Sequence, residues 1–207
     1  MNKQGMLIVI SGFSGVGKGT AAKRLVEKYG YSLSISATTR APREGEVDGR
    51  EYYFKTVEEF RNLIDYNGFI EYAQYVENYY GTPRAYVEKE LALGHNVILE
   101  IEVEGAKKIK EQYPNAILIF ISASSAGELR DRLTGRGTEE EAVITKRMNR
   151  AKEESMSIPS YEYFVINRNG ALEQCVDEIH AIVTAKKLEI EFWNDDILEI
   201  QNELKAM

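Results

Sequence analysis

The sequence predicts an α/β fold with a parallel central sheet flanked by helices on both faces. Three observations lead to this prediction. Short, nearly continuous apolar runs recur along the chain, helical stretches separate them, and a glycine-rich loop joins the first run to the first helix. Apolar strands without alternation are typical of parallel sheets that are buried on both faces. With 207 residues, the chain is long enough for one core domain with small insertions.

The core elements can be assigned in order along the chain. A helix after the first strand should end at Gly30, because glycine suits the left-handed position at a helix C-terminus. The stretch GAKKIKEQYP should form a crossover helix that stops before Pro114. A long amphipathic helix from Gly170 to about Trp193 should close the domain, with a polar tail beyond Asn194. The strands are expected at residues 6–11, 96–103, 115–122 and 161–168.

Two segments interrupt the alternation of strands and helices. Residues 36 to about 82 are rich in Tyr, Gly and charge without a long apolar run, which indicates a small inserted α+β subdomain. Residues 130–150 carry several arginines and should form two helices joined at the turn Gly135-Arg136-Gly137. We therefore predict a core at 1–34, 84–134 and 156–207, an insertion at 35–83, and a short lid at 135–155.

Local signals predict two helix starts near the insertion. Thr56 and Glu59 have the spacing of a capping box, which should open a short helix. Thr82 is expected to cap the N-terminus of a second helix, with Pro83 in its first turn and Gly94 past its end.

The composition excludes several classes of function. A net charge of −7 gives no overall attraction to nucleic acids or to membrane surfaces, so we expect neither as a partner. The single cysteine, Cys175, excludes an intramolecular disulfide and indicates a reducing compartment. Its helical spacing with Val176 and Ile179 indicates a core position. No signal peptide or membrane span is evident, so a cytoplasmic location is expected. The sequence carries no signal of oligomeric state.

The loop SGFSGVGKGT, residues 11–20, has the spacing of a phosphate-binding loop. Its backbone N–H groups can surround phosphate oxygens at a helix N-terminus, where the helix dipole favours anions. Lys18 would neutralise the terminal phosphates. A glycine-rich turn with an incidental lysine is the alternative, and the flanking strand and helix argue against it. The predicted contacts with a nucleoside triphosphate are Gly12, Ser14, Gly15, Val16, Gly17, Lys18, Gly19 and Thr20.

Gly19 stands where a Ser or Thr hydroxyl usually reaches Mg2+, and Thr20 follows one position late. Mg2+ keeps several waters in such sites, so one protein ligand is dispensable. Glutamates at 100, 102 and 104 occupy alternate positions at the end of the second strand, and they share one face while the chain stays extended. Such carboxylates repel one another, so Mg2+ or a donor-rich base should be their partner, or one should be protonated. We expect Glu100 and Glu102 to be functional, and Glu104 to belong to an acidic first helical turn. Glu100 and Thr20 are the candidate metal ligands, partly through water.

The inserted segment indicates a second phosphate site. Arg40 and Arg43 are three residues apart, and guanidinium groups pair bidentately with phosphate. Tyr52 and Tyr80 could donate to the same phosphate. Glu71 lies among aromatic residues, where a carboxylate could accept both N1–H and N2–H of guanine, a pairing that adenine cannot offer. A solvated basic loop and an exposed strand glutamate are the alternatives.

Six motifs in this order resemble the guanylate kinase family over about residues 7–180: GFSGVGKGT, TTRAPREGEVDGREYYF, FIEYAQYVENYYGTPR, LEIEVEGA, RLTGRGTEEEAVITKR and FVIN. The resemblance implies a P-loop nucleoside monophosphate kinase fold. It also implies transfer of the γ-phosphate of ATP to GMP, with Mg2+, giving ADP and GDP.

The resemblance assigns roles residue by residue. Ser36, Arg40, Arg43, Tyr52 and Tyr80 would hold the GMP phosphate, and Glu71, Thr82 and Glu102 would read guanine. Arg132, Arg136 and Arg147 would close over ATP and the transferring phosphate, where Lys18 and Arg40 also act, and Asn167 would lie near adenine.

Some positions depart from the family pattern. Phe13 replaces a usual Pro, and NRNG after the last strand replaces a more acidic sequence. Glu100, Glu102 and Glu104 replace Asp-x-Asp followed by Gln, so each of the first two carboxylates has one more methylene of reach.

Two other functions fit parts of this pattern. One is a related protein-binding module that has lost catalysis, which would be expected to lack the loop lysine or the lid arginines. The other is a P-loop kinase with a different phosphorylated acceptor. Glu71 beside the phosphate clamp argues against this second alternative.

Overall fold

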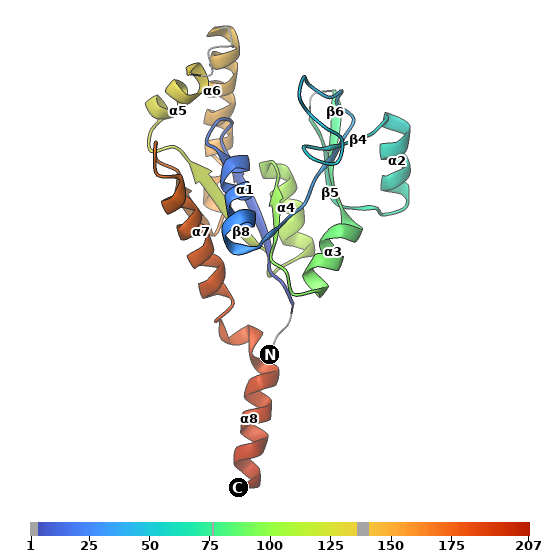
Figure 1. Ribbon diagram of the computed structural model, residues 1–207, viewed down its shortest axis with the longest axis vertical. Helices are drawn as coiled ribbons and strands as arrows, with labels where there is room; N and C mark the ends of the chain where they lie inside the picture. The colour runs from blue at the N-terminus through green and yellow to red at the C-terminus, as the bar shows by residue number, and fades with distance from the viewer. Residues whose placement is uncertain (1–3, 76, 136–140) are drawn as a thin grey trace.

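The central sheet has five strands, and its strand pairs are all parallel. The computed structural model describes residues 4–75, 77–135 and 141–207 (Figure 1). The sheet order is β2–β7–β1–β8–β9, which places β1 in the middle. The predicted parallel α/β fold is thereby confirmed. The strands are β1 (Leu7–Gly12), β2 (Ser32–Leu33), β7 (Val97–Glu100), β8 (Ile117–Ser122) and β9 (Tyr163–Ile166).

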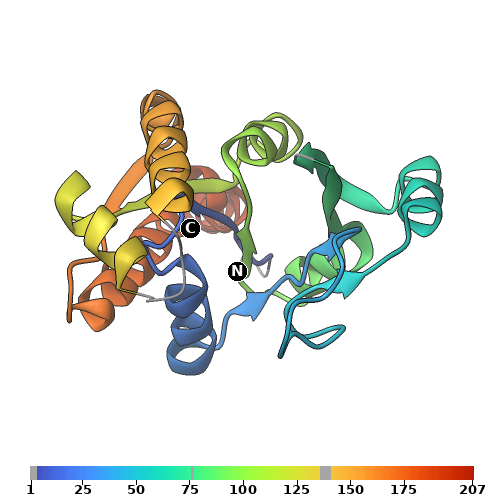
Figure 2. The ribbon, with the colours of Figure 1, turned by 90° about the horizontal axis from the view of Figure 1, so that it is seen from above.

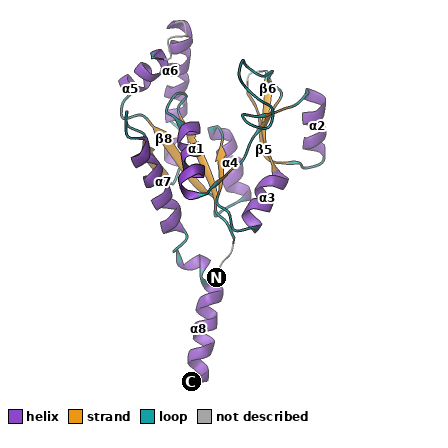
Figure 3. Cartoon of the chain, viewed as in Figure 1, coloured by secondary structure: helices purple, strands orange, loops and turns teal. Residues whose placement is uncertain are grey.

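Helices cover both faces of this sheet, as Figure 3 shows. Alternate side chains of β1 point to two separate cores. Ile8 and Ile10 pack with α1, α5, α6 and α7, whereas Leu7 and Val9 pack with α3 and α4. Cys175 is fully buried in the first core, and burial raises the pKa of its thiol to about 11, as expected for a core residue. The helices are α1 (Lys18–Tyr29), α3 (Arg84–Ala92), α4 (Val103–Gln112), α5 (Ala126–Thr134), α6 (Glu141–Ser155) and α7 (Leu172–Lys186).

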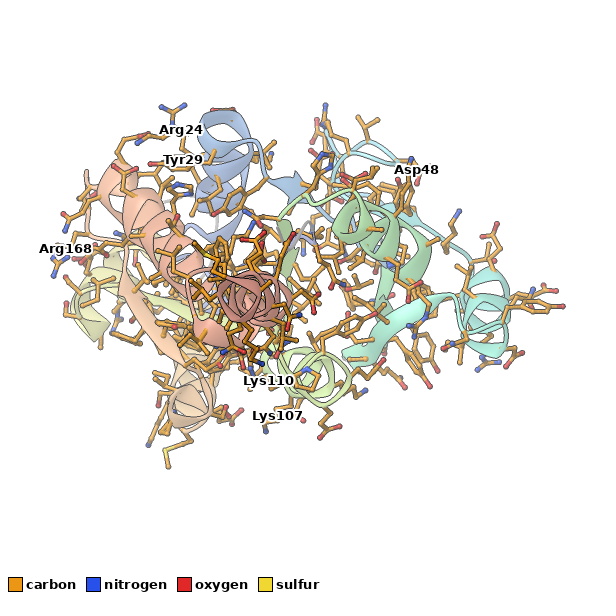
Figure 4. All side chains as sticks on the ribbon, turned by 90° about the horizontal axis from the view of Figure 1, so that it is seen from below. Arg24, Tyr29, Asp48, Lys107, Lys110 and Arg168 are labelled. Carbon is orange, nitrogen blue, oxygen red and sulfur yellow. The ribbon has the colours of Figure 1, made fainter. Side chains whose placement is uncertain are left out.

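Polar contacts join α1, the helix that follows the phosphate loop, to α7. Arg24 Nε lies 2.6 Å from Oε1 of Glu173. The Tyr29 hydroxyl donates to Oδ1 of Asp177 at 2.7 Å. Figure 4 shows Arg24 and Tyr29 on the side of α1 next to α7. Exposed ion pairs add little stability, so these contacts mainly fix how the two helices lie against each other.

A second, four-stranded sheet has the order β4–β3–β6–β5. Its small core contains Ala37, Phe60 and Phe69. The predicted capping box is confirmed at Thr56, whose Oγ1 accepts from the backbone N–H of Glu59 at 3.1 Å while the Glu59 carboxylate accepts from Thr56 N at 2.7 Å. Seen from above in Figure 2, this sheet and α2 stand at one end of the molecule, α5 and α6 at the other, and α1 and α4 between them. The elements are β3 (Ala37–Thr38), β4 (Tyr53–Phe54), α2 (Val57–Asp65), β5 (Phe69–Tyr75) and β6 (Asn78–Pro83).

Two local predictions are wrong because neighbouring elements compete for the same residues. The strand expected at 96–103 ends at Glu100, since the chain turns and begins α4 at Val103. Glu104 consequently lies in the first turn of α4, as expected. Thr82 does not cap α3, whose N-cap is Pro83. Thr82 lies in β6 instead, and its hydroxyl donates to Glu71.

The C-terminal region also differs from the prediction of one long helix and a polar tail. Helix α7 ends at Lys186, and a 3-10 turn at Ile190–Phe192 leads into a further helix, α8 (Asn194–Ala206). Helix α8 projects away from the core and carries the C-terminus at its tip (Figure 1). No helix within the described ranges is both long and apolar enough to cross a membrane.

Candidate active site

Two cavities meet at the carboxyl edge of the central sheet, the edge where ligands bind in open α/β folds. The larger, of about 780 Å³, follows the phosphate loop. The smaller, of about 500 Å³, lies between α1, the start of α4 and the second sheet. Two phosphorylated ligands, one in each cavity, would approach each other at the residues that the cavities share. These shared residues are Lys18, Gly19, Lys23, Tyr52, Glu100, Glu102 and Arg150.

The phosphate loop joins β1 to α1. Gly17 caps α1 with φ of 91°, and a Cβ there would lie 2.8 Å from Asn167 Nδ2, so the position requires glycine. The Lys18 ammonium donates to the carbonyl oxygens of Gly12 at 2.8 Å and Phe13 at 3.2 Å. These hydrogen bonds hold Lys18 on the loop, at the junction of the two cavities. The predicted loop contacts that line the larger cavity are Gly12, Ser14, Gly15, Gly17, Lys18, Gly19 and Thr20.

Phe13 is an anchor for the loop. Its ring packs edge-on against Phe120, with the centroids 5.0 Å apart, and only 9% of the residue is exposed. The departure from Pro at this position therefore adds apolar contact with the core.

Val16 is fully buried and does not line the described cavities. Its carbonyl oxygen accepts from Nη1 of Arg132 at 3.2 Å and from Nδ2 of Asn167 at 2.8 Å. Arg132 Nη2 also donates to the Asn167 carbonyl at 2.6 Å and to Glu128 at 2.5 Å. Arg132 and Asn167 thus hold the back of the loop, and neither lines the two cavities. Their contact with ATP stays a prediction.

Gly19 and Glu100 adjoin each other. A Cβ on residue 19 would lie 3.1 Å from Oε2 of Glu100, so the glutamate uses the space that a side chain at 19 would need. The Glu100 carboxylate faces both cavities. Desolvation by the surrounding protein raises the pKa of the Glu100 carboxyl, against the opposing effect of Lys18, although the residue is exposed.

The oxygen donors at this junction fit Mg2+, which usually takes one or two carboxylates together with phosphate oxygens and water. Glu100 borders both cavities, and Thr20 borders the larger. In the part of the chain that the structure describes, no group of three or more His, Cys, Asp or Glu side chains could hold a metal ion. Such an ion would therefore depend on the nucleotide and water for most of its ligands.

Glu71 is the buried acid of the smaller cavity, with 6% of the residue exposed. Its Oε1 accepts a 2.6 Å hydrogen bond from the Thr82 hydroxyl. Burial raises the pKa of Glu71, while the Thr82 hydrogen bond opposes that rise. A Cβ on Gly105, in the first turn of α4, would lie 2.8 Å from Oε2 of Glu71. The α4 backbone therefore fits closely against this carboxylate.

The predicted acceptor residues do not all meet in one place. Ser36, Tyr52, Glu71, Tyr80 and Glu102 line the smaller cavity. The rings of Tyr52 and Tyr80 have centroids 6.0 Å apart, so the two phenols lie near each other.

The two arginines of the predicted phosphate clamp lie elsewhere. Arg40 Nη2 donates to both carboxylate oxygens of Glu46 at 2.9 Å, and Arg40 lines neither cavity. Arg43 lines the larger cavity. Its backbone N–H donates to Glu46 at 2.7 Å, which lowers the pKa of Glu46 with further help from Arg40. The Arg40 guanidinium, which was expected to bind phosphate, thus pairs with Glu46 of the same loop.

Several residues that line the cavities were not predicted from the sequence. Lys23 lines both cavities, four residues after Gly19 on α1. Arg150 and Glu154 line the larger cavity together with the predicted Arg147. Helical spacing was the available signal, because positions 147, 150 and 154 share one helix face. The described lining of the larger cavity holds six basic and four acidic side chains, a local excess of positive charge in a chain of net charge −7. Arg136 lies outside the described residues.

The fold and the site together define a P-loop phosphotransferase, with one cavity on the phosphate loop and a second beside an inserted sheet. Comparison with known proteins makes the assignment specific. The family model for guanylate kinase matches residues 4–186. The chain belongs to the guanylate kinase family.

Individual relatives agree with this assignment. The guanylate kinase of Caldanaerobacter subterraneus subsp. tengcongensis is 48% identical over 204 residues, which cover 98% of each chain. That of Halalkalibacterium halodurans is 50% identical over 186 residues, covering 89% of this chain and 90% of the relative. The crystal structure of guanylate kinase from Anaplasma phagocytophilum matches with a TM-score of 0.74 and 32% identity, covering 90% of this chain and 88% of that one.

Proposed function

We propose that the protein transfers the γ-phosphate of ATP to GMP, giving ADP and GDP. One observation carries this proposal. A cavity on the phosphate loop and a cavity that holds the buried Glu71 share Lys18, Tyr52 and Glu100. A donor triphosphate and an acceptor monophosphate bound in these cavities would therefore present their phosphates to each other.

The chemistry requires positioning and charge neutralisation more than covalent catalysis. A phosphate oxygen of GMP forms a bond to the γ-phosphorus, and the bond from that phosphorus to the β–γ bridging oxygen breaks, so that ADP leaves. Lys18, Arg43 and Arg147 supply positive charge along the donor cavity. Glu100, with Thr20 through water, would hold Mg2+, which adds positive charge at the phosphates.

The acceptor base is recognised in the smaller cavity, which Glu71 lines and whose wall toward the larger cavity includes Glu102. Glu71, fixed by Thr82, accepts from N1–H and N2–H of guanine, and Glu102 provides a further acceptor. Ser36, Tyr52 and Tyr80 donate to the GMP phosphate. Arg40 and Arg43 complete this clamp when the phosphate replaces Glu46 as the partner of Arg40. The competition is between two anions for one guanidinium, so a doubly charged phosphate has the advantage.

Closure completes the site. Residues 135–155, with Arg136 and Arg147, act as a lid, and the insertion at 35–83 moves toward it over the core formed by 1–34, 84–134 and 156–207. Arg132 supports the phosphate loop while ATP is bound. Asn167 supports the same loop and lies near the adenine of ATP. Excluding water favours transfer to GMP over hydrolysis. A cytoplasmic location fits the single reduced cysteine.

The test is a coupled assay with ATP and a panel of acceptors, GMP, dGMP, AMP and UMP, each with and without Mg2+. We expect activity with GMP and dGMP that depends on Mg2+. Activity with none of the acceptors would favour a binding module, and a preference for AMP or UMP would favour a kinase of different specificity.

A further inference from the structure

Arg150 connects helix α6 to the wall that the two cavities share. Its Nε donates to Oε1 of Glu154 at 2.6 Å, and its Nη2 donates to Oε2 of Glu102 at 2.8 Å. A guanidinium is planar, so fixing Nε on one carboxylate orients Nη2 toward the other. Arg150 and Glu102 both line the two cavities. The bridge therefore ends at a residue that faces the acceptor.

Glu154 is the fixed end of this bridge. Its side chain is 13% exposed, compared with 29% for Arg150 and 59% for Glu102. Helix α6 itself is held by Ile144 and Ala151, which are buried in the main core. The core holds α6 in place, Glu154 therefore restrains Arg150, and Arg150 in turn restrains Glu102.

Glu102 has no comparable anchor on its own helix. It is the N-cap residue of α4, yet its side chain makes no capping hydrogen bond. A glutamate this exposed loses substantial rotamer freedom when it is held in one place. An exposed ion pair contributes little to folding stability. Arg150 therefore acts mainly by fixing the position of the Glu102 side chain.

Guanine presents three hydrogens on the edge that Glu71 reads, one on N1 and two on N2. The two oxygens of Glu71 can accept two of them. The second N2 hydrogen requires another acceptor. With Oε2 of Glu102 engaged by Arg150, Oε1 of the same carboxylate is the oxygen that can serve.

We propose that Arg150 is a positioning residue for the acceptor base. By bridging Glu154 and Glu102, it presents the Glu102 carboxylate to the N2 amino group of guanine and sets the preference for GMP over inosine 5′-monophosphate (IMP), which lacks that group. This inference rests on the proposed function, since it requires GMP in the smaller cavity.

The experiment compares kcat and KM for GMP and IMP at saturating ATP in the wild type, Arg150→Gln and Lys152→Gln. Lys152 is an exposed cation on the same helix that lines neither cavity, so its variant matches the change in charge. Arg150→Gln should lower the ratio of kcat/KM for GMP over IMP by roughly 10-fold, through KM for GMP, because one charge-assisted hydrogen bond loses its alignment. Lys152→Gln should keep the wild-type ratio.

Two further variants separate positioning from charge. Arg150→Lys keeps the charge but replaces the planar guanidinium, whose Nη2 has a fixed orientation, with a single ammonium nitrogen, so it should behave like Arg150→Gln. In a Glu102→Gln background, adding Arg150→Gln should change the GMP to IMP ratio no further. If Arg150→Gln does not fold, Arg150→Lys provides the same comparison.

Three results would overturn the inference. One is an unchanged ratio in an active Arg150→Gln enzyme, and another is an equal loss of kcat with both acceptors, which would mean that Arg150 acts on the transferred phosphate. The third is a wild-type ratio in Arg150→Lys. A wild-type enzyme inactive with GMP would instead overturn the proposed function and the inference with it.

Discussion

Oε2 of Glu100 lies 3.1 Å from the place where a Cβ on residue 19 would stand. The two positions are therefore sterically linked, and a side chain at 19 displaces the carboxylate. Gly19→Ala, which adds a Cβ but no hydroxyl that could bind the metal, should weaken the preference of the enzyme for Mg2+-bound ADP over free ADP by about 10-fold, a typical cost when a metal ligand loses its support. Calorimetric titration of ADP with and without Mg2+ measures this preference directly.

The same variant has a close control and a compensating partner. Gly127→Ala is the same change at the equivalent second position of α5, where a Cβ would meet only Ser125 Oγ at 3.7 Å, so Mg2+ preference should not change. Glu100→Asp should restore part of the preference in the Gly19→Ala background, because the shorter side chain leaves room. Wild-type behaviour of Gly19→Ala would contradict the link.

Lys18→Ala should reduce kcat by on the order of 100-fold or more, since a charge at the transferred phosphate is lost. GMP binding should survive, because the base end of the acceptor cavity is untouched. Steady-state kinetics and equilibrium binding of GMP separate the two effects. Lys107→Ala serves as the control, because Lys107 lies on α4 (Figure 4) outside both cavities and pairs with Glu104. Wild-type turnover in Lys18→Ala would remove this lysine from the mechanism.

Glu71→Gln should raise KM for GMP by roughly 10- to 100-fold, which corresponds to the free energy lost with charge-assisted hydrogen bonds to the base. KM for ATP should stay near the wild-type value, since Glu71 lines only the smaller cavity. Equal loss of affinity for both nucleotides would exclude a base-reading role.

Glu71 also predicts a pH dependence of stability. Burial raises its pKa in the folded state, so the folded chain holds this proton more tightly than the unfolded chain. The resulting stability is complete below the ordinary pKa and is lost as pH rises through the raised pKa. The free energy of unfolding of the wild type, relative to Glu71→Gln, should therefore fall as pH increases from about 4. Urea titrations at several pH values give the difference, and a flat or rising trend would contradict the assignment.

Gly105→Ala should separate stability from GMP binding. Alanine favours a helix over glycine by about 1 kcal/mol, but the added Cβ would lie 2.8 Å from Oε2 of Glu71. Because Thr82 restrains that carboxylate, its displacement should raise KM for GMP on the order of 10-fold. Thermal unfolding should show no loss of stability. Gly127→Ala is the matched control on α5, and an unchanged KM in Gly105→Ala would show that Glu71 adjusts freely.

The features that sequence could predict are those determined by near neighbours along the chain. The phosphate loop, the Thr56–Glu59 capping box and the buried strand at 115–122 each depend on residues a few positions apart. The strand at 96–103 was overextended because alternating apolar and acidic residues satisfy a strand pattern, whereas the backbone turns after Glu100 to start α4. Local periodicity contains no information about that turn.

The sequence alone also could not predict which polar side chains pair with one another in the fold. Thr82 has the features of a helix cap, but Glu71, eleven residues away, takes its hydroxyl. Arg40 has the spacing of a phosphate ligand, but Glu46 pairs with it. In the bridge from Glu154 through Arg150 to Glu102, Arg150 and Glu102 are 48 positions apart, and only the fold places α6 close enough to the start of α4 for them to meet.

Helix α8 gives the molecule a natural point of attachment. Met207 lies at its tip, at the opposite end of the molecule from the loop that joins β1 to α1 (Figure 1). The family match ends at residue 186, before this helix begins. A fluorophore, an affinity handle or a surface tether joined to Met207 would therefore stand clear of both nucleotide cavities, so the enzyme can be immobilised by this end with its substrates free to enter.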